Sequence, residues 1–444
     1  MTNEDRERLR RYREYLDFYN GKQWRASPRP TERCITLNYA RTFVHKCASY
    51  LFGAPYGLSV PPVAASPAAT ERAAEAERLL KSTYEHNGLW ATDYDTAVDC
   101  AVLGDGAYKV TWDALAEQPA VVAVDPQTLE VSRAPDDYRR MATVRQTYPL
   151  PVEEAARRWG VRVPGGGGEV AITEEWTAAA LTILVDDRPV STVPNVLGEP
   201  PYVVFPNVRK PHSPWGESDL VDIMEPAREL NSRMSMLAHI LEVSGNPIAV
   251  LENVDAGDGI RVAPGELWEL PERSRAYLLD MLSGGGVRLH IEYIDLLYRC
   301  LHDLAETPRT AFGDSGRVIS GAALEVEMEP LVQKVSRKCA IWTGVIQQRN
   351  ELMLRLIERS RGLDLSPYRT LVHWPSLLPE DRSQLVRDEV ALVGAGVHSR
   401  RRAMDALGED APEEEWARVL EEGEIYHGDR RERRDGDDTE GGDV

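Results

Sequence analysis

Residues 308–324 read PRTAFGDSGRVISGAAL, and a helical pattern follows them without a break to about Arg361. The quoted stretch is polar and rich in glycine and serine, which favours a loop. The apolar residues after it recur every three or four positions, so they form one stripe along about ten turns of a single helix. Pro330 is expected to kink this helix, because proline removes a backbone donor. The stripe consists of Leu324, Met328, Leu331, Val335, Cys339, Trp342, Ile346, Met353 and Ile357.

Two shorter helical patterns precede the loop. The first begins at Ser218, with Asp219 near the positive end of the helix, and the second runs from about Val287 to Glu306. The intervening residues 244–286 are mixed in character and indicate a small β-containing insertion, so the two helices form an αα-hairpin with a head. The long helix needs neighbours along its whole length, and these two helices also carry one apolar stripe each; identical copies of the chain around a ring would supply the partners. The stripes are Leu220, Ile223, Met224, Ala227, Leu230, Met234, Leu237 and Leu241, then Leu289, Ile294, Leu297, Leu301 and Leu304.

The first 210 residues combine helices with short strands. Helices are predicted at 4–19, 37–52, 70–87 and 89–103, and Thr70 is expected to cap the third. The strand-like segments that follow indicate an α+β domain over residues 90–210, with a mainly antiparallel sheet. These segments are 107–112, 120–124, 141–148, 169–177 and 180–185.

The C-terminal part is again helical and acidic. A short strand is expected at 371–374, and helices are expected within 379–426. Pro379 and Pro412 are each followed by acidic residues, as is common at the start of a helix. Residues from Asp429 onward are charged and glycine-rich, which is typical of a disordered tail.

The composition excludes several classes of protein. Of the 444 residues, 42% are hydrophobic and 28% are charged, as in folded soluble domains. No apolar run approaches the ~18–20 residues of a membrane span, and the charged N-terminus lacks the apolar segment of a signal peptide. A net charge of −20 argues against tight DNA binding, which rests on lysine and arginine neutralising phosphates. It leaves open a surface with sparse cations past which DNA slides.

Nothing in the sequence predicts catalysis. Residues 313–316, GDSG, have the letters found around the nucleophile of chymotrypsin-like proteases, but they lie between two helices and lack the required β-barrel context. No phosphate-binding G-x-x-x-x-G-K-[ST] motif occurs. We therefore expect no enzymatic activity and no cofactor.

Nothing in the sequence predicts a metal site either. The nine histidines have no ligand spacing. The odd number of cysteines, without CxxC spacing, indicates reduced thiols in a protein made in the cytosol. The cysteines are Cys34, Cys47, Cys100, Cys300 and Cys339.

Taken in order along the chain, several short matches resemble the portal proteins of tailed bacteriophages, in particular the family found in many long-tailed phages. Each match is short, so the resemblance rests on their order across residues 12–426. The matches are Tyr19-Asn20-Gly21-Lys22-Gln23; Asn38, Arg41 and Val44; Tyr50-Leu51-Phe52-Gly53-Ala54-Pro55; Asp125-Pro126; Val204-Phe205-Pro206-Asn207; Gly216-Glu217-Ser218-Asp219-Leu220 with Asn231; Ser320-Gly321-Ala322-Ala323-Leu324; and Pro379-Glu380-Asp381 with Ser399.

The resemblance implies an α+β portal fold that assembles as a ring, expected to be a dodecamer. It implies the following regions: N-terminal helix 1–25, wing 26–217, first stem helix 218–243, clip 244–286, second stem helix 287–306, tunnel loop 307–322, long helix 323–361, wing return strand 362–378, helical crown 379–427 and disordered charged tail 428–444.

The resemblance also implies a function. Portal proteins of this family form the channel at one capsid vertex, through which double-stranded DNA is driven in by a separate terminase and later ejected. The expected partners are other copies of the chain, the passing DNA, the terminase large subunit, the head-tail adaptor, and the major capsid and scaffold proteins, with no membrane. The expected location is the virion, after assembly in the host cytoplasm.

Two groups of candidate site residues follow from this resemblance. In a ring each charged residue repeats by symmetry, so one arginine per subunit becomes a belt of cations. The channel candidates are Arg309, Asp314, Arg317, Ser320, Lys334, Arg337 and Lys338. The clip candidates, for docking terminase and adaptor, are Ile248, Glu252, Asp258, Arg261 and Trp268.

Two departures and two alternatives remain open. Residues 244–286 are short for a clip, and Arg309 and Arg317 mean that the channel is not purely acidic. Each candidate cation is alternatively a solvated or salt-bridged surface residue. The whole chain is alternatively a virion adaptor or scaffold protein that forms no ring, with the long helix in a small coiled coil.

Overall fold

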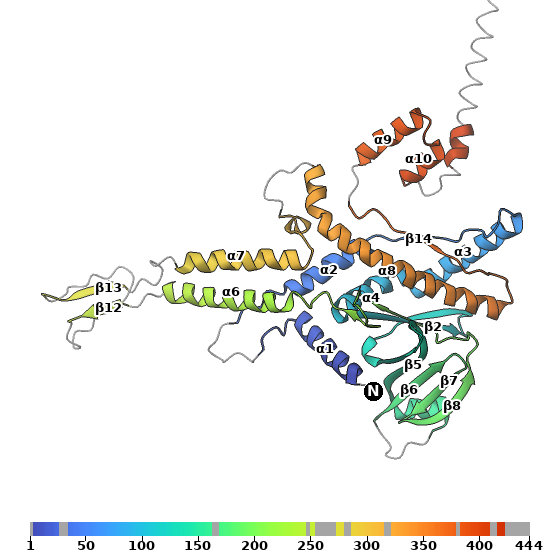
Figure 1. Ribbon diagram of the computed structural model, residues 1–444, viewed down its shortest axis with the longest axis horizontal. Coiled ribbons are helices and arrows are strands. Elements are labelled where there is room, and N and C mark those ends of the chain that lie inside the picture. Colours follow the sequence, from blue (N-terminus) through green and yellow to red (C-terminus); the bar gives the residue numbers. More distant parts are fainter. Residues whose placement is uncertain are drawn as a thin grey trace, which may run out of the picture. The chain divides into compact units, whose positions relative to one another are not determined.

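The computed structural model describes residues 3–25, 34–161, 168–245, 249–253, 272–278, 286–314, 321–378, 382–408 and 415–421. The chain divides into two compact units, residues 1–375 and 376–444. Helices and antiparallel sheets both build the first unit, which confirms the α+β class (Figure 1). No helix within the described ranges has the length and apolar character needed to cross a membrane.

Four helices form near the predicted positions at the start of the first unit. The cap of α3 is Ser66 and not Thr70, because Pro67 occupies the first helical position and the Thr70 hydroxyl donates to the Ser66 carbonyl at 3.1 Å. α4 ends at Gly104, whose φ of 100° favours glycine. The helices are α1 (Asn3–Tyr19), α2 (Tyr39–Phe52), α3 (Pro67–Asn87) and α4 (Leu89–Leu103).

Two antiparallel sheets follow α4. A three-stranded sheet of order β3-β2-β9 packs against α4 and α8, and a five-stranded sheet is the meander β4-β5-β6-β7-β8. The predicted strands correspond to β2, β3, β5, β6 and β7. The sequence pattern missed β4, β8, β9 and the short helix α5; β8 carries Pro189 and Pro194, which an edge strand tolerates. The bounds are β2 (Asp105–Asp113), β3 (Gln118–Ala123), β4 (Leu129–Ala134), β5 (Asp137–Pro151), α5 (Val152–Trp159), β6 (Glu169–Thr177), β7 (Ala180–Val185), β8 (Arg188–Pro194) and β9 (Tyr202–Pro206).

Short strand pairs close the first unit. The strand predicted at 371–374 is present as β14 (Leu371–His373), which pairs antiparallel with β1 (Gly57–Ser59). This pair returns the chain after the long helix to the N-terminal helices. A second pair joins β10 (Val208–Arg209) to β11 (Gly216–Glu217), and a 3-10 helix, η1 (Pro126–Thr128), precedes β4.

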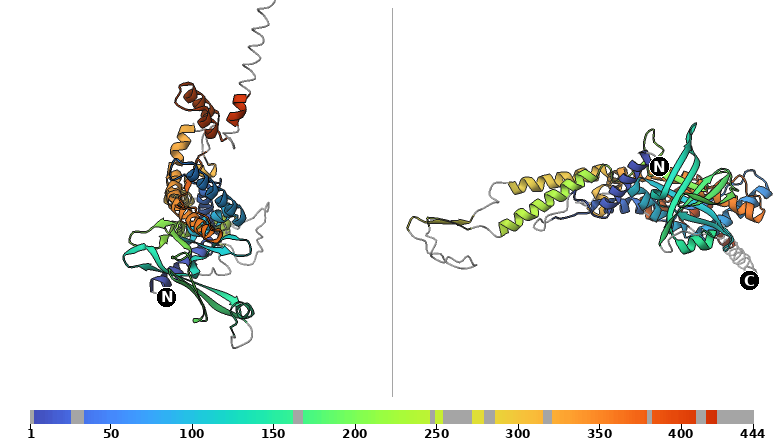
Figure 2. Two further views of the ribbon diagram at one scale, coloured as in Figure 1. Left: turned by 90° about the vertical axis from the view of Figure 1, so that its right-hand side faces the viewer. Right: turned by 90° about the horizontal axis from the view of Figure 1, so that it is seen from below.

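The predicted helical hairpin consists of α6 (Met224–Gly245) and α7 (Gly286–Leu304), which lie side by side and extend away from the sheets of the first unit (Figures 1 and 2). The expected start of the first helix at Ser218 was wrong. Residues 219–223 form turns, because the hydroxyl of the preceding Ser218 donates to the Val102 carbonyl at 2.6 Å and fastens this stretch to α4. The chain between the helices contains the pair β12 (Ala249–Glu252) and β13 (Arg275–Leu278), as predicted for a small β-containing insertion.

The base of this hairpin is anchored in a buried hydrophobic cluster of the first unit. Side chains from α1, α2, α4, α6 and α7 meet there, together with the turns before α6. Phe43, Leu220, Ile223, Leu230 and Leu301 are each at most 3% exposed. The two helices of the hairpin therefore share a hydrophobic core with α1, α2 and α4.

The long helix is α8 (Gly321–Arg361), a single helix of 41 residues that contains Pro330. Its N-terminal part, where Pro330 lies, runs in a different direction from the rest (Figure 1). The expectation that this helix needs copies of the chain to bury its stripe was wrong. From Met328 to Ile357 the stripe is at most 8% exposed within the chain itself, because α2, α3, β2 and β9 cover it. Leu324, near the start, is 42% exposed.

The second unit is a small helical body. It contains α9 (Arg382–Gly394), α10 (Arg400–Ala406) and a further helical segment at 415–421. Glu389 is buried and lies 2.9 Å from Nδ1 of His398. Both prolines predicted to start helices, Pro379 and Pro412, lie outside the described residues.

Candidate functional site

The quoted stretch begins where α7 ends and the chain turns toward α8. Glu306 has a left-handed φ of 49°, and the fully buried Thr307 follows it. A 3-10 helix, η2 (Arg309–Phe312), comes next and ends at Gly313, whose φ is 85°. Arg317 and Ser320, two of the predicted channel residues, lie outside the described residues.

Arg309 and Asp314, also predicted as channel residues, form an ion pair across η2. Nη2 of Arg309 lies 2.6 Å from Oδ2 of Asp314, and the guanidinium stacks over the Tyr298 ring at 5.3 Å from its centroid. The hydrogen bond to Asp314 raises the pKa of Arg309. The arginine side chain is 39% exposed, so this cation is accessible but already partly neutralised.

An aromatic cluster lies beneath η2. The Phe312 ring packs edge to face with Phe43 of α2 and with His302 of α7, at centroid distances of 5.9 and 5.5 Å. Nζ of Lys46, on α2, lies 5.1 Å from the Phe312 centroid. The sequence analysis missed Lys46, because its place near η2 depends on packing between helices that are far apart in the chain.

Lys334 and Lys338 do not belong to an accessible site. Their side chains are 13% and 6% exposed, and both ammonium groups face Asp219, at 3.7 and 3.0 Å. Burial alone would raise the pKa of Asp219, but the two lysines outweigh it and lower this pKa to about 2. Lys338 is buried and Lys334 is half-buried, and both are paired with Asp219, so they are less accessible to a phosphate than Arg309; their contact with DNA stays a prediction.

The remaining predicted residues are scattered or undescribed. Arg337 is 59% exposed and pairs with Glu306, just after α7, so it remains a candidate. Glu252 is exposed on β12 and accepts a hydrogen bond from the Tyr277 hydroxyl at 3.2 Å. The other clip candidates, Ile248, Asp258, Arg261 and Trp268, lie outside the described residues.

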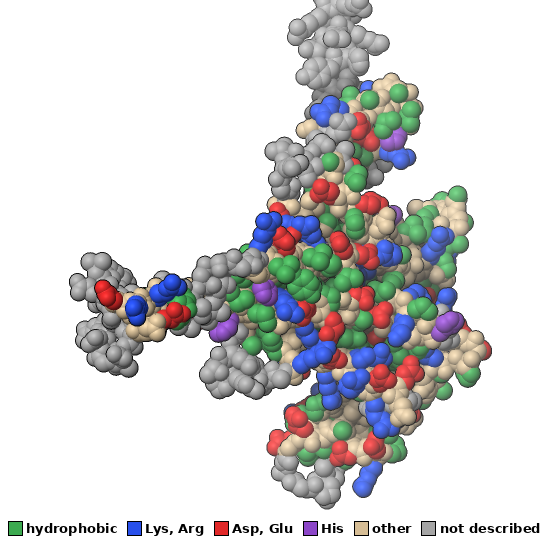
Figure 3. All heavy atoms as spheres, turned by 60° about the vertical axis from the view of Figure 1, so that its left-hand side comes forward, with side chains coloured by type: hydrophobic (Ala, Val, Ile, Leu, Met, Phe, Trp, Pro, Cys, Tyr) green, Lys and Arg blue, Asp and Glu red, His purple; other side chains and the backbone are tan. Residues whose placement is uncertain are grey.

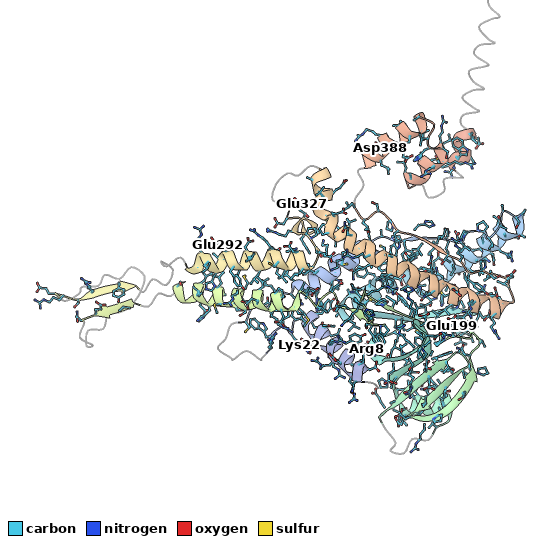
Figure 4. The ribbon with its side chains drawn as sticks, in the orientation of Figure 1. Arg8, Lys22, Glu199, Glu292, Glu327 and Asp388 are labelled. Carbon is cyan, nitrogen blue, oxygen red and sulfur yellow. The ribbon has the colours of Figure 1, made fainter. Side chains whose placement is uncertain are left out.

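The stem helices, α6 and α7, carry several exposed apolar side chains. On α7, Leu297 and Leu301 contribute to the core at the base of the hairpin, whereas Leu289, Tyr293 and Leu296 are exposed and spaced by four and three residues. Glu292 projects on the side away from α6 (Figure 4). The exposed apolar residues in the described part of the stem are Met236 (44%), Leu241 (52%), Leu289 (68%), Ile291 (53%), Tyr293 (38%), Leu296 (55%) and Leu304 (48%).

Charges of both signs alternate over the face that carries the stem, with hydrophobic side chains between them (Figure 3). The visible part of this face shows no continuous basic surface of the kind that holds DNA tightly. Within the described ranges, no group of three or more His, Cys, Asp or Glu residues could hold a metal ion. The five cysteines are free thiols.

A buried ion pair, which the sequence analysis also missed, joins α4 to α8. Asp93 and Arg349 are both 0% exposed and contact each other twice, once at 2.9 Å. Hydroxyls of Tyr56 and Tyr108 donate to the carboxylate at 2.6 Å, and Arg349 donates to the Tyr84 hydroxyl at 2.9 Å. This network fixes the long helix to α4, and its two charged residues are fully buried.

Comparison of the chain with models of known protein families gives a match. A family model described as "Phage portal protein, SPP1 Gp6-like" matches residues 1–427 of the 444. No curated protein matches the chain.

Proposed function

Because the chain belongs to the SPP1 Gp6-like family of phage portal proteins, we propose that it forms a ring at one capsid vertex through which double-stranded DNA enters and leaves the virion. The match over residues 1–427 is the observation that carries this proposal. It spans both units, from α1 to the helical segment at 415–421. The chain would act as a structural component, without catalytic activity or a cofactor.

The exposed apolar face of the stem supports a ring of identical chains. Leu289 and Leu296 are more than half exposed, although burying such a side chain stabilises a protein by about 1.5–3 kcal/mol. A neighbouring copy would cover this face with another surface of its own stem. Contacts between two different faces generate a ring when the rotation closes, and the proposed ring is a dodecamer.

The segment from η2 to the start of α8 is the proposed DNA-facing loop. Arg309 is accessible there, and Arg317 lies in the same stretch of sequence. Repeated around the ring, each arginine would give a belt of transient phosphate contacts. Partial neutralisation of Arg309 by Asp314 would keep each contact weak, so that DNA can slide.

The remaining regions would serve docking. The stretch 244–286, which contains β12 and β13, is proposed as the clip that meets the terminase large subunit during packaging and the head-tail adaptor afterwards. Residues 26–217 would form the wing, and 379–427 the crown. The major capsid and scaffold proteins would contact the ring at its capsid vertex.

Electron microscopy of the purified protein, combined with mass photometry, tests the proposal. We expect annular particles with a central hole and a mass of many chains. A coiled-coil adaptor would instead give about two to four chains and no annulus. A well-folded monomer at high concentration would contradict both assignments.

A further inference from the structure

His302, in the last turn of α7, holds the chain reversal that leads into η2. Its Nδ1 lies 2.6 Å from the Thr307 carbonyl oxygen, which can only accept, so Nδ1 carries the proton. Its own carbonyl accepts from the Thr307 backbone N–H at 3.0 Å. The Thr307 hydroxyl donates to the Ala305 carbonyl at 2.9 Å. We call these three residues, His302, Ala305 and Thr307, the clasp.

The other ring nitrogen of His302, Nε2, has no hydrogen-bond acceptor nearby, among the described residues, for a proton that it would carry. The residue is 4% exposed, and Nε2 is buried without a hydrogen-bond partner in the described part of the chain. Rings of Phe43, Tyr298 and Phe312 surround it, with centroids at 5.1, 4.6 and 5.5 Å. A neutral imidazole suits this cage. An imidazolium would bury both a charge and an N–H without an acceptor.

The charged groups around the clasp give the same direction on balance. Burial lowers the pKa of His302, and the nearby Arg309 lowers it further. The hydrogen bond to Thr307 and the carboxylates of Asp303 and Asp314 raise this pKa. The net shift is downward. The other charged groups near the clasp are Lys46 of α2, beside Phe312; Lys334 of α8, which donates to the Ala305 carbonyl; and the pair of Glu306 with Arg337 of α8.

We propose that the clasp is a proton-operated latch, which acid opens and neutral pH closes. The closed form holds a neutral His302, so it binds fewer protons than an open form with a solvated imidazole. The equilibrium constant for closing therefore has its full value above the ordinary histidine pKa of about 6.5. Below that pH it falls by up to about tenfold per pH unit. The latch itself does not depend on the proposed function. Its effect on the DNA path does, because the latch holds residues 307–314, the described start of the proposed DNA-facing loop.

Hydrogen exchange of the full-length protein tests the latch, with rates corrected for intrinsic exchange. Between pH 7.5 and 5.5, protection of residues 303–314 is expected to fall at least about threefold, within the limit of tenfold per pH unit. Protection of residues 345–357 in α8 should not change. His302→Gln, which keeps a donor but does not titrate, should abolish the pH dependence. His239→Gln, on an exposed position of α6, should leave it as in the wild type.

The outcomes separate the latch from the proposed function. Protection that stays constant in the wild-type protein, or a pH dependence that survives in His302→Gln, would overturn the latch. Because the wild-type profile stands alone, a variant that fails to fold does not remove the test. Mass photometry of the same samples follows assembly: a responsive latch without rings would contradict only the ring, and rings with an unresponsive latch would contradict only the latch. Rings that dissociate at pH 5.5 to the same extent in the wild type and in His302→Gln would also overturn the latch.

Discussion

At the scale of residues, buried charges hold the elements of the first unit together. Asp93 and Arg349 join α4 to α8, and Asp219 joins the turns before α6 to the two lysines of α8. A buried ion pair costs much desolvation, so its net contribution is modest, but removing one partner leaves an uncompensated charge. The main effect of these ion pairs is therefore to specify which elements pack together, and their net contribution to stability is smaller.

Asp93→Ala should destabilise the protein strongly. The substitution leaves the guanidinium of Arg349 buried without its carboxylate, and two tyrosine hydroxyls lose their acceptor. We expect a loss of about 3–5 kcal/mol in the free energy of unfolding, measured by urea denaturation. Asp95→Ala, at an exposed position of the same helix, should change it by less than about 0.5 kcal/mol. Similar losses in both variants would contradict the assigned role.

Asp219 should make stability depend on acid. Its pKa is about 2 in the folded chain, against about 3.9 when unfolded, so its ionised form favours folding by about 2 kcal/mol. This contribution is complete above about pH 4 and is lost as the pH falls through 2. Urea midpoints of the wild type and Asp219→Asn should therefore converge between pH 4 and 2. Asp222→Asn, at an exposed position nearby, should show no such convergence.

At the scale of elements, similar amphipathic patterns have different partners. The stripe of α8 is buried by helices and strands of its own chain, so this helix does not need a second copy. In the stem, α7 buries one apolar face at its base and exposes another. The stem, and not the long helix, therefore carries the exposed apolar face that the proposed ring would bury.

Leu296→Asp should weaken the ring without unfolding the protomer. The leucine is 55% exposed in the single chain, so the aspartate is tolerated there, but it would be buried against a neighbour. Each contact should lose about 1.5–3 kcal/mol, roughly a 10- to 150-fold rise in the dissociation constant. Mass photometry measures the assembly, and circular dichroism the helix content. Leu296→Met should keep the ring, and an intact ring in Leu296→Asp would exclude this face from the interface.

At the scale of the whole molecule, the net charge of −20 and the mixed charges on the face that carries the stem suit a channel better than a clamp (Figure 3). Sparse cations repeated by symmetry give weak contacts at many points, whereas a continuous basic surface would hold DNA in place. The chain thus combines a predominantly acidic composition with two arginines near the start of α8.

Replacing both Arg309 and Arg317 by alanine should alter DNA packaging. Each arginine that contacts phosphate releases counterions, so their loss should reduce the dependence of packaging on salt concentration. A packaging assay over a series of salt concentrations measures this. Arg140→Ala removes an exposed arginine from β5, where it pairs with Asp136 of the turn before that strand, and should have no effect. An unchanged salt dependence in the double variant would remove the loop from the proposed DNA path.

Much of the fold could be predicted from local patterns. Helical periodicity located α1, α2, α4, α7 and α8, and the strand-like segments located β2, β3, β5, β6 and β7. The pattern failed where tertiary contacts override it: Ser218 looks like a helix cap but is bound to the end of α4, and β8 relies on its place at a sheet edge. For the candidate site, the sequence indicated the stretch that contains η2 and Arg309, but could not separate exposed Arg337 from half-buried Lys334 and buried Lys338.

What the sequence determined by itself is therefore local: where helices run, which residues share a face, and the ordered matches that indicated a portal protein. The tertiary structure alone decided which charges meet, as when Asp93 finds Arg349, or Asp219 finds Lys338, more than a hundred positions away. Periodicity records only whether a face is apolar, and burial depends on what packs against that face. The stripe of α8 found its cover within the chain, while the outer face of α7 did not.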